Sequence, residues 1–349
     1  MDSNRVVTLC EMAPRDGMQI VNRDCKIPLQ ERVQLVRLLQ EAGLAYIEVG
    51  SFVRQDRVPS MQDTPELLQS ISRYEGQLAV LVPNLRYYSK HADCQNLDTV
   101  ALFLASSENY TWLNKGITIE KDLVDARELV SAARKDGRRV RAHLSCAFRD
   151  IPSHAPTPAE LVCKMCRELL EAGCELVALA DTDGRASGAD IRRVLGVLAK
   201  DTGLQNIGLH LHDRFGLGIA HAMLAYEMGV RTFDTAAAGI GGNKIVRNSV
   251  GNVATEELAF HFEGMGISTG IEMERLMKAA HVVRQMTRQV GDPEPPSRIL
   301  VDDLLSTQLI EEFLGKLPDC FDPQEYISPK LQQFSDEVFR AQEIECDRP

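Results

Sequence analysis

Two histidines one residue apart are the most unusual chemical feature of the sequence. His210 and His212 lie in the apolar stretch NIGLHLHDRFG (206–216). Side chains at positions i and i+2 of a β-strand share a face, so the two imidazoles would lie together while Leu209 and Leu211 point to the other side. Buried imidazoles need hydrogen-bond partners or a metal ion. The pair therefore indicates either a metal site or two hydrogen-bonded core histidines.

Further polar residues stand where other apolar stretches end. If those stretches are parallel strands of a barrel, their carboxyl ends meet at one mouth, which is where barrel enzymes carry their active sites. This convergence favours a metal site over a pair of core histidines. The side chains expected at the mouth are Arg15, Asp16 and Gln19, then Glu48 and Ser51, then Arg141, His143 and Ser145, then Asp181, Thr182 and Asp183, and finally Asn252.

The elements that would position these residues alternate along the chain. Short apolar stretches predict strands at 6–12, 45–52, 77–84, 99–106, 139–146, 175–182, 207–213 and 232–239. Amphipathic stretches between them predict helices at 29–43, 64–76, 85–93, 118–137, 158–173, 187–203 and 218–230. The helices are expected to end at glycines, namely Gly43, Gly76, Gly137, Gly173, Gly203 and Gly229.

Eight strands alternating with helices predict an α/β fold, a TIM (β/α)8 barrel. An open doubly wound sheet is the alternative, and the absence of a GxGxxG motif after the first strand disfavours it. Two more helical stretches follow, at 256–266 and 271–291. We therefore expect a barrel domain over residues 1–290.

The last part of the chain has a different composition. GDPEPPSR (291–298) is typical of a linker, and residues 301–349 hold 12 acidic and 4 basic side chains, most of the formal net charge of −11. We predict an acidic helical C-terminal extension over residues 291–349, either a solvated cap or an oligomer contact.

Composition excludes several classes of protein. No apolar run reaches the 18 residues that a membrane span needs, and no basic stripe suggests nucleic acid. The N-terminus has no signal or transit pattern. Nine cysteines in 349 residues are too dilute for a disulfide scaffold, so a cytoplasmic location is expected. Cys163 and Cys166 form a CxxC within a predicted helix and are interpreted as buried thiols.

Several longer segments carry a family resemblance. They are RDGMQ (15–19), EVGSFVRQDRVPSMQD (48–63), VPN (82–84), LFLASSENYTWLNKGITIEKDL (102–123), SCAF (145–148), GCELVALADTDG (173–184), HLHDRFG (210–216), AYEMGVRTFDTAAAGIGG (225–242) and GNVATEEL (251–258). Over about residues 5–290 the chain resembles the 3-hydroxy-3-methylglutaryl-CoA lyase family. That family lies within a wider group of metal-dependent barrel lyases and Claisen synthases.

The resemblance implies a set of roles. It implies that Asp16, His210, His212 and Asn252 bind a divalent metal, Mg²⁺ or Mn²⁺ in the family, although the ligand types also suit Zn²⁺ or Fe²⁺. It implies that Arg15 stabilises an enolate oxygen, with a fixed guanidinium aimed at developing charge.

Two acidic residues, Glu48 and Asp181, match active-site positions of the family. The resemblance implies one of two roles for each of them: orienting Arg15 or a metal ligand, or transferring a proton.

Other positions depart from the family pattern. Asn243 stands where the lyases have a cysteine after paired glycines, and an amide is a poor proton donor. His143 stands where the family has Tyr, and acts either as an acid or base or as a buried hydrogen-bonded residue. IVNRDCK (20–26) and AFRDIPSHA (147–155) also differ from the lyases. Gln19, Lys244 and Arg247 are expected to contact the cofactor or an anionic substrate, with a solvated loop as the alternative for the two cations.

The family reaction is a retro-Claisen cleavage. We expect a metal-dependent carbon–carbon lyase that acts on a 3-hydroxyacyl-CoA thioester or a related hydroxy acid. The alternatives are a Claisen-type synthase that joins an acyl-CoA to a 2-oxo acid, as in isopropylmalate and homocitrate synthases, and a non-catalytic metal-binding barrel. The expected partners are a small-molecule substrate and a second copy of the chain in a homodimer, with no nucleic acid and no membrane.

Overall fold

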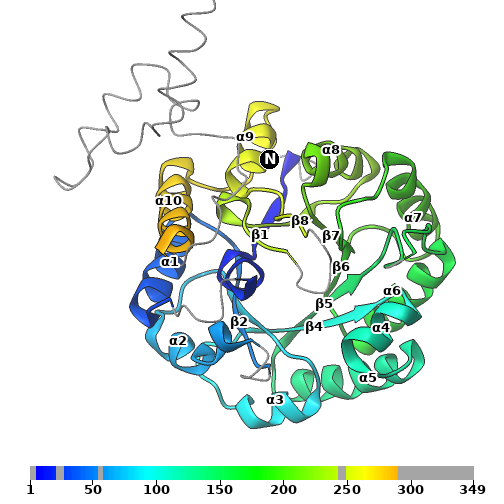
Figure 1. Ribbon diagram of the computed structural model, residues 1–349, viewed down its shortest axis with the longest axis horizontal. Helices are drawn as coiled ribbons and strands as arrows, with labels where there is room; N and C mark the ends of the chain where they lie inside the picture. The colour runs from blue at the N-terminus through cyan, green and yellow to red at the C-terminus, as the bar shows by residue number, and fades with distance from the viewer. Residues whose placement is uncertain (1–4, 21–26, 54–57, 152, 243–248, 290–349) are drawn as a thin grey trace, which may run out of the picture. The chain divides into compact units, whose positions relative to one another are not determined.

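Eight parallel strands close into a barrel in the computed structural model, which describes residues 5–20, 27–53, 58–151, 153–242 and 249–289. Each strand pairs with the next along the chain, and β8 pairs with β1 through Thr8–Thr232 to Glu11–Thr235. Figure 1 shows the barrel with the helices arranged around it. The strands are β1 (Thr8–Glu11), β2 (Tyr46–Ser51), β3 (Gln77–Leu81), β4 (Thr99–Ala105), β5 (Arg139–Ser145), β6 (Leu176–Asp181), β7 (Ile207–Leu211) and β8 (Thr232–Thr235). The prediction of a TIM barrel is confirmed.

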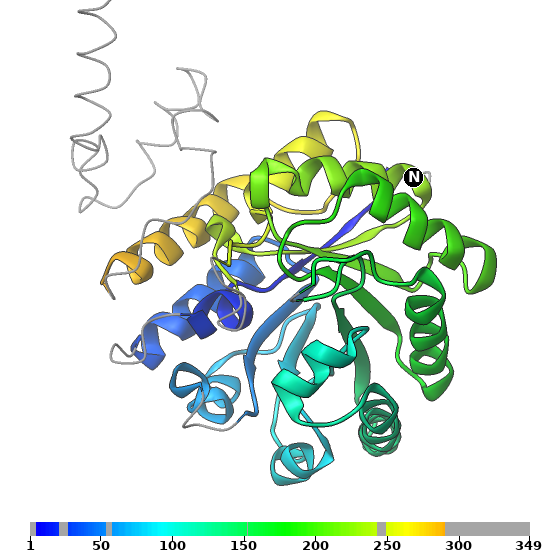
Figure 2. The ribbon, with the colours of Figure 1, turned by 45° about the vertical axis from the view of Figure 1, so that its right-hand side comes forward.

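Helices follow the strands and cover the outside of the barrel, as Figure 2 shows from a second direction. They are α1 (Leu29–Glu41), α2 (Thr64–Ser70), α3 (Leu85–His91), α4 (Glu108–Lys115), α5 (Ile119–Lys135), α6 (Ala159–Ala172), α7 (Gly188–Asp201), α8 (Gly218–Met228), α9 (Thr255–Gly264) and α10 (Met273–Gln289). Every helix predicted within the described residues is present, with ends that differ by a few residues.

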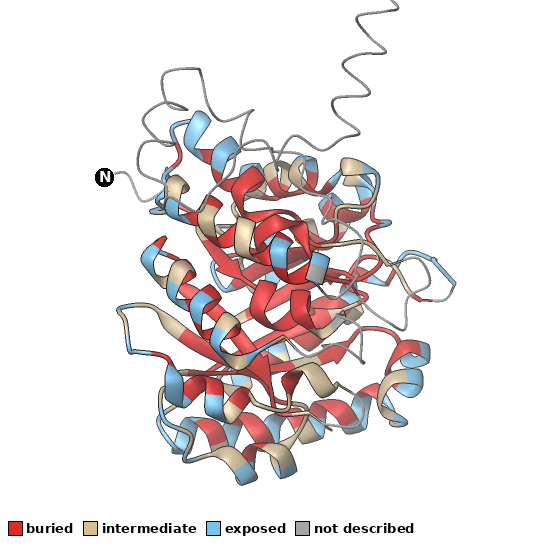
Figure 3. Cartoon of the chain, turned by 60° about the vertical axis from the view of Figure 1, so that its left-hand side comes forward, coloured by how far each residue is buried: buried red, intermediate tan, exposed pale blue. Residues whose placement is uncertain are grey.

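The helices bury one face against the strands and expose the other, as the colours of Figure 3 show. On α6, Val162, Met165 and Leu169 are fully buried. Cys163 and Cys166 lie on the same buried face, and burial raises the pKa of both thiols. This confirms that the CxxC is a pair of buried helix thiols.

Glycines end several of the helices as predicted. Gly173 and Gly229 adopt left-handed φ angles of 115° and 116°, and their N–H groups bond to the last helical carbonyls. The prediction for Gly76 is wrong, because α2 ends earlier, at Ser70. There the side chain of Asn96 donates to the carbonyls of Leu68 and Ile71, so a distant amide does the capping that the sequence suggested for a glycine.

One helix, α4, was not expected. Its residues Trp112 and Leu113 are each 64% exposed, and these exposed apolar side chains hide the helical period. The signals that mark it are at its ends: Ser107 caps the N-terminus by accepting from Tyr110 N–H, and Gly116 follows the last turn at φ 71°.

No helix among the described ranges is long and apolar enough to cross a bilayer. The predicted linker, the acidic extension and the domain boundary at residue 290 lie outside the described residues, and so do Asn243, Lys244 and Arg247. The division into domains therefore stays a prediction.

Candidate active site

Asp16 lies in a tight turn that follows β1. The chain leaves the strand in a short π-helical turn, Ala13–Gly17, in which Arg15 and Asp16 are each only 6% exposed. Asp16 Oδ1 accepts from Gln19 Nε2 at 2.9 Å and lies 2.6 Å from Arg15 Nη1. Burial opposes ionisation of Asp16, but the charges of Arg15 and His210 outweigh it and lower its pKa. The turn therefore presents an ionised carboxylate.

The two histidines lie on β7 and just beyond it, both 6% exposed. His210 Nδ1 lies 3.2 Å from Asp234 Oδ2, and His212 Nδ1 lies 2.8 Å from the carbonyl of Val250. A carbonyl only accepts, so His212 carries its proton on Nδ1 and keeps a lone pair on Nε2. Burial, together with the charge of His210, lowers the pKa of His212 to about 4. Each ring thus has one nitrogen anchored and the other left to bind.

Asn252 lies beside His212 because residues 250–253 run antiparallel to the end of β7. His212 and Asn252 are partners in an isolated β-bridge. The amide Nδ2 donates to Asp16 Oδ2 and to the carbonyl of Ile240, both at 2.9 Å. These two bonds use both N–H groups and fix the orientation of the amide. Asn252 Oδ1 is buried and has no hydrogen-bond partner among the described residues.

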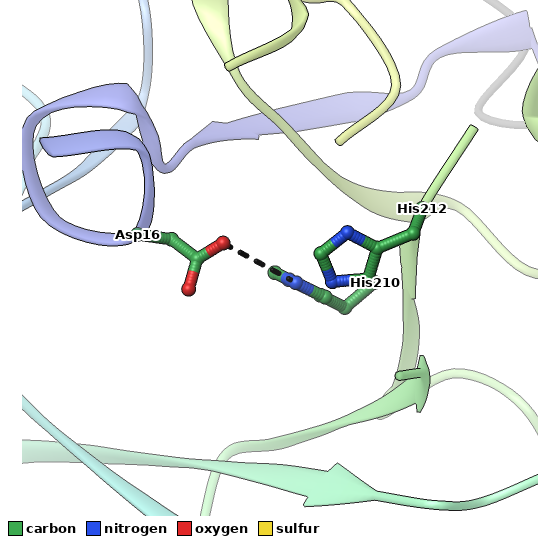
Figure 4. Close-up of side chains that lie close together, drawn as sticks. All are labelled: Asp16, His210 and His212. Carbon is green, nitrogen blue, oxygen red and sulfur yellow. Dashed lines mark ion pairs between the residues drawn. The ribbon is translucent and has the colours of Figure 1, made fainter. Parts of the chain in front are cut away.

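These groups form a site that fits a divalent cation. The ligand atoms of Asp16, His210 and His212 lie within 4.8 Å of one another. Figure 4 shows the Asp16 carboxylate turned toward His210, whose Nε2 lies 4.0 Å from Asp16 Oδ2. The unpartnered oxygen of Asn252 is costly to bury unless something binds it. One carboxylate, two imidazoles and one amide oxygen are donors that such a cation takes.

A glycine lets the loop after β8 lie against this site. Gly241 has a left-handed φ of 133°, and a Cβ there would lie 2.1 Å from Asn252 Nδ2 and 3.0 Å from Asp16 Oδ2. Any larger residue would push Asn252 away from Asp16. Steric exclusion of any side chain therefore explains why the first of the paired glycines, Gly241, is a glycine.

Charged side chains behind the site hold Arg15 in place. Glu48, fully buried on β2, forms an ion pair with Arg15 Nε, and its other oxygen lies 2.9 Å from His143 Nε2. Burial raises the pKa of Glu48, but the charges of Arg15 and His143 outweigh it and hold the pKa below its ordinary value. Glu48 thus lies where it can orient Arg15, which is one of the roles expected for it.

Asp234 was not singled out in the sequence. It lies on β8 with its carboxylate buried, forms an ion pair with Arg141, and contacts both His210 Nδ1 and His143 Nδ1, the latter at 3.4 Å. Carboxylates that hold the second nitrogen of a metal-ligating histidine fix the ring and its tautomer. The sequence feature that could have identified it is a single charged residue in the predicted strand TFDTAAAG, between Phe233 and Thr235.

Asp181 lies at the end of β6, where both carboxylate oxygens accept from the N–H of Ala186. Burial raises its pKa to about 7. His143 lies between Glu48 and Asp234, and although burial lowers its pKa, the charge of Glu48 outweighs this and raises it. Both nitrogens of His143 face carboxylates, the environment of a buried hydrogen-bonded histidine.

Comparison with known proteins places this barrel within one family. The HMGL-like family model matches residues 6–283. The 3-hydroxy-3-methylglutaryl-CoA lyase, cytoplasmic, of Mus musculus is 32% identical over 278 residues, 79% of this chain and 80% of that protein. The hydroxymethylglutaryl-CoA lyase, mitochondrial, of Gallus gallus is 33% identical over 272 residues, 78% and 90% of the two chains.

Solved structures agree with the sequence comparison. The crystal structure of the HMG-CoA lyase of Bacillus subtilis superposes with a TM-score of 0.79 at 30% identity, covering 88% of this chain and 98% of the other. Fold and site together define a barrel of the metal-dependent lyase class. The chain belongs to the HMGL-like family, which confirms the resemblance seen in the sequence.

Proposed function

We propose that the protein is a divalent-metal-dependent carbon–carbon lyase that cleaves a 3-hydroxyacyl-CoA thioester. One observation carries the metal dependence: the buried Asn252 Oδ1 has no hydrogen-bond partner among the described residues and lies beside Asp16 and the histidine pair. Cleavage rather than condensation is supported by the relatives, which are named as lyases rather than synthases. Mg²⁺ or Mn²⁺ is the proposed metal, because the family uses these ions and half of the ligand set is oxygen.

The residues of the site have separate roles in metal binding and in stabilising the enolate. When bound, the cation polarises the substrate's oxygens and makes its hydroxyl easier to deprotonate. Asp16, His210, His212 and Asn252 would hold it. Arg15, kept in one orientation by its ion pair with Glu48, places a fixed positive charge where the enolate oxygen develops.

Burial supports this arrangement. Arg15 and Asp16 are 6% exposed and Glu48 is 0% exposed, so little water competes with them. Ion pairs and hydrogen bonds are stronger in such a site than in water.

A product assay tests the proposal. The purified protein, loaded with Mg²⁺ or Mn²⁺, is given 3-hydroxy-3-methylglutaryl-CoA and other 3-hydroxyacyl-CoA thioesters, and acetyl-CoA is measured. Release of acetyl-CoA that stops with chelator is the expected result. Consumption of acetyl-CoA with a 2-oxo acid would instead favour the synthase. Failure to turn over either type of substrate would favour the non-catalytic barrel.

We also propose a homodimer in the cytoplasm. The family resemblance implies a dimer, and the free, buried thiols among the described residues suit a reducing compartment. Light scattering after size-exclusion chromatography tests the assembly, and a mass of 38.8 kDa would show a monomer instead.

A further inference from the structure

The proposed reaction leaves an enolate whose carbon must be protonated. Asn243 stands where the family has an acidic thiol, and an amide is a poor donor. This chain therefore needs another acid, and the following inference rests on the proposed function.

The ionisable groups already described at the strand ends are committed elsewhere. Glu48 is paired with Arg15, and both nitrogens of His143 lie against carboxylates. His210 and His212 are needed for the metal. Asp181 is anchored through both carboxylate oxygens to the N–H of Ala186. Cys146 is fully buried, and burial raises its pKa to about 12.

His154 is a further imidazole at this end of the barrel. It lies in the loop between β5 and α6, within the segment AFRDIPSHA that departs from the family. Its Nδ1 lies 3.0 Å from Asp183 Oδ2; the His154 side chain is 49% exposed and that of Asp183 only 2%. Arg185 Nε lies 3.3 Å from the same oxygen.

The buried oxygen of Asp183 is unsatisfied in a way that the imidazole can correct. No donor among the described residues is aligned with Oδ2 in hydrogen-bond geometry. The ring torsion of a histidine is soft, so a small rotation of the His154 ring would point Nδ1–H at Oδ2. Nε2, on the opposite edge of the ring, would then be left to exchange protons. One nitrogen held by a buried carboxylate and the other open is how acid–base histidines are arranged.

The loop holds His154 in a conformation that a histidine rarely adopts. Its φ is +56°, in the left-handed region. The N–H of His154 bonds to the carbonyl of Asp150 at 3.0 Å, and its own carbonyl accepts from Arg149 Nη1 at 2.8 Å. Arg149 is fixed in turn by Asp190 on α7. Such backbone strain persists where the surroundings impose it, and it is concentrated at functional sites.

Asp183 connects this loop to the metal site. It follows Asp181 and Thr182 at the end of β6, and its carbonyl accepts from Arg214 Nε at 2.6 Å. A Cβ on the next residue, Gly184, would lie 2.9 Å from the carbonyl oxygen of His212. The turn that carries Asp183 therefore packs directly against the segment that carries His212.

We propose that His154, oriented by Asp183, is the acid–base residue that protonates the enolate carbon in this protein. A base removes the proton of the C3 hydroxyl, the C2–C3 bond breaks, and its electron pair forms the enolate of the acetyl thioester. The Nε2 proton of His154 then passes to the enolate carbon. C3 becomes the carbonyl of the second product, the base returns its proton to water, and the neutral imidazole takes a proton up again, so protons and electrons balance.

Exchange of the methyl hydrogens of acetyl-CoA in D2O, followed by mass spectrometry, tests the proposal because it reports proton transfer at that carbon. H154N keeps a residue that tolerates a left-handed φ but cannot carry the proton. We expect its exchange rate to fall about 100-fold or more. D183N should also slow exchange, but by less, while H261N, on the exposed face of α9, should match the wild type.

H154G separates catalysis from structure. Glycine adopts φ +56° without strain, which offsets the lost contact with Asp183, so the protein should stay folded at the assay temperature while exchange falls. Added imidazole should restore part of the exchange in H154G and none in D183N.

The inference is overturned if H154N and H154G exchange at the wild-type rate, or if only D181N loses exchange, which would assign the step to Asp181. If the wild type cleaves the thioester and exchanges the methyl hydrogens, and H154N does so equally well, only this inference is overturned. A wild type that does neither overturns the proposed function as well.

Discussion

A single amide joins the two halves of the candidate metal site. Asn252 donates to Asp16 from one end and leaves Oδ1 unpartnered among the described residues at the other. The same residue is the β-bridge partner of His212. One side chain thus sets the distance between the carboxylate and the imidazoles.

We expect N252A to lose this arrangement. The variant removes one proposed oxygen ligand and leaves Asp16 Oδ2 without its donor, so the affinity for Mn²⁺ should fall at least about tenfold. Isothermal titration calorimetry measures it, with N206A, an exposed position before β7, as the control. Equal Mn²⁺ affinity in N252A and wild type would exclude Asn252 as a ligand.

Substitution of Asn243 tests whether the departure from the family's cysteine limits the reaction. N243C restores the thiol that the lyases have, and cleavage of 3-hydroxy-3-methylglutaryl-CoA should rise, because a thiol donates a proton far more readily than an amide. Acetyl-CoA release measures it, and N243S separates acidity from size. No gain from the cysteine would mean that this position does not limit proton transfer.

At the scale of elements, one buried carboxylate joins the turns that carry the site. Glu11, at the end of β1, accepts from the N–H groups of Ala13 and Ala237 with Oε1 and from Thr255 Oγ1 with Oε2. Ala13 opens the turn that holds Asp16, and Ala237 follows β8. Glu11 therefore fixes the two turns relative to each other.

Glu11 also gives a pH prediction. Burial raises its pKa from 4.5 to about 7, so the folded state prefers the neutral acid. The stability that this proton contributes is complete below about pH 4.5 and is lost as the pH rises through about 7. E11Q stays neutral and keeps an oxygen for both N–H groups. Its free energy of unfolding relative to wild type should therefore increase by about 3 kcal/mol between pH 4.5 and pH 8.

Urea unfolding at the two pH values measures this difference. E160Q, at an exposed position on α6, is the control. A difference between E11Q and wild type that does not change with pH would mean that Glu11 ionises as easily in the folded protein as in the unfolded chain.

At the scale of the whole molecule, the site exists because the barrel closes. Pairing of β8 with β1 brings the Asp16 turn beside Asn252, although the two residues are 236 positions apart in the sequence. A cation that binds only this closed form stabilises it by mass action.

Metal should therefore protect the barrel from heat. At a free Mn²⁺ concentration about 100 times the Kd, the stabilisation is about 2.7 kcal/mol, which raises the melting temperature of a barrel this large by about 4–5 °C. Differential scanning calorimetry with Mn²⁺ and with chelator measures the shift. D16A should show none, and a full shift in D16A would place the cation elsewhere.

The sequence by itself determined the alternation of strands and helices and the residue types at the strand ends. Both are local properties: periods of 2 and 3.6 residues set which face is apolar, and glycines and polar residues mark where elements end. The position of α4 was missed because its exposed Trp112 and Leu113 break that period.

Only the tertiary structure decided which polar residues meet. Arg141 and Asp234 pair across 93 positions, and no local pattern encodes that separation. The unpartnered oxygen of Asn252, the shared bonds of Glu11 and the approach of His154 to Asp183 follow in the same way from barrel closure and loop packing. Side-chain contacts of this kind depend on the distances between elements, and those distances are fixed only when all eight strands pack around one core.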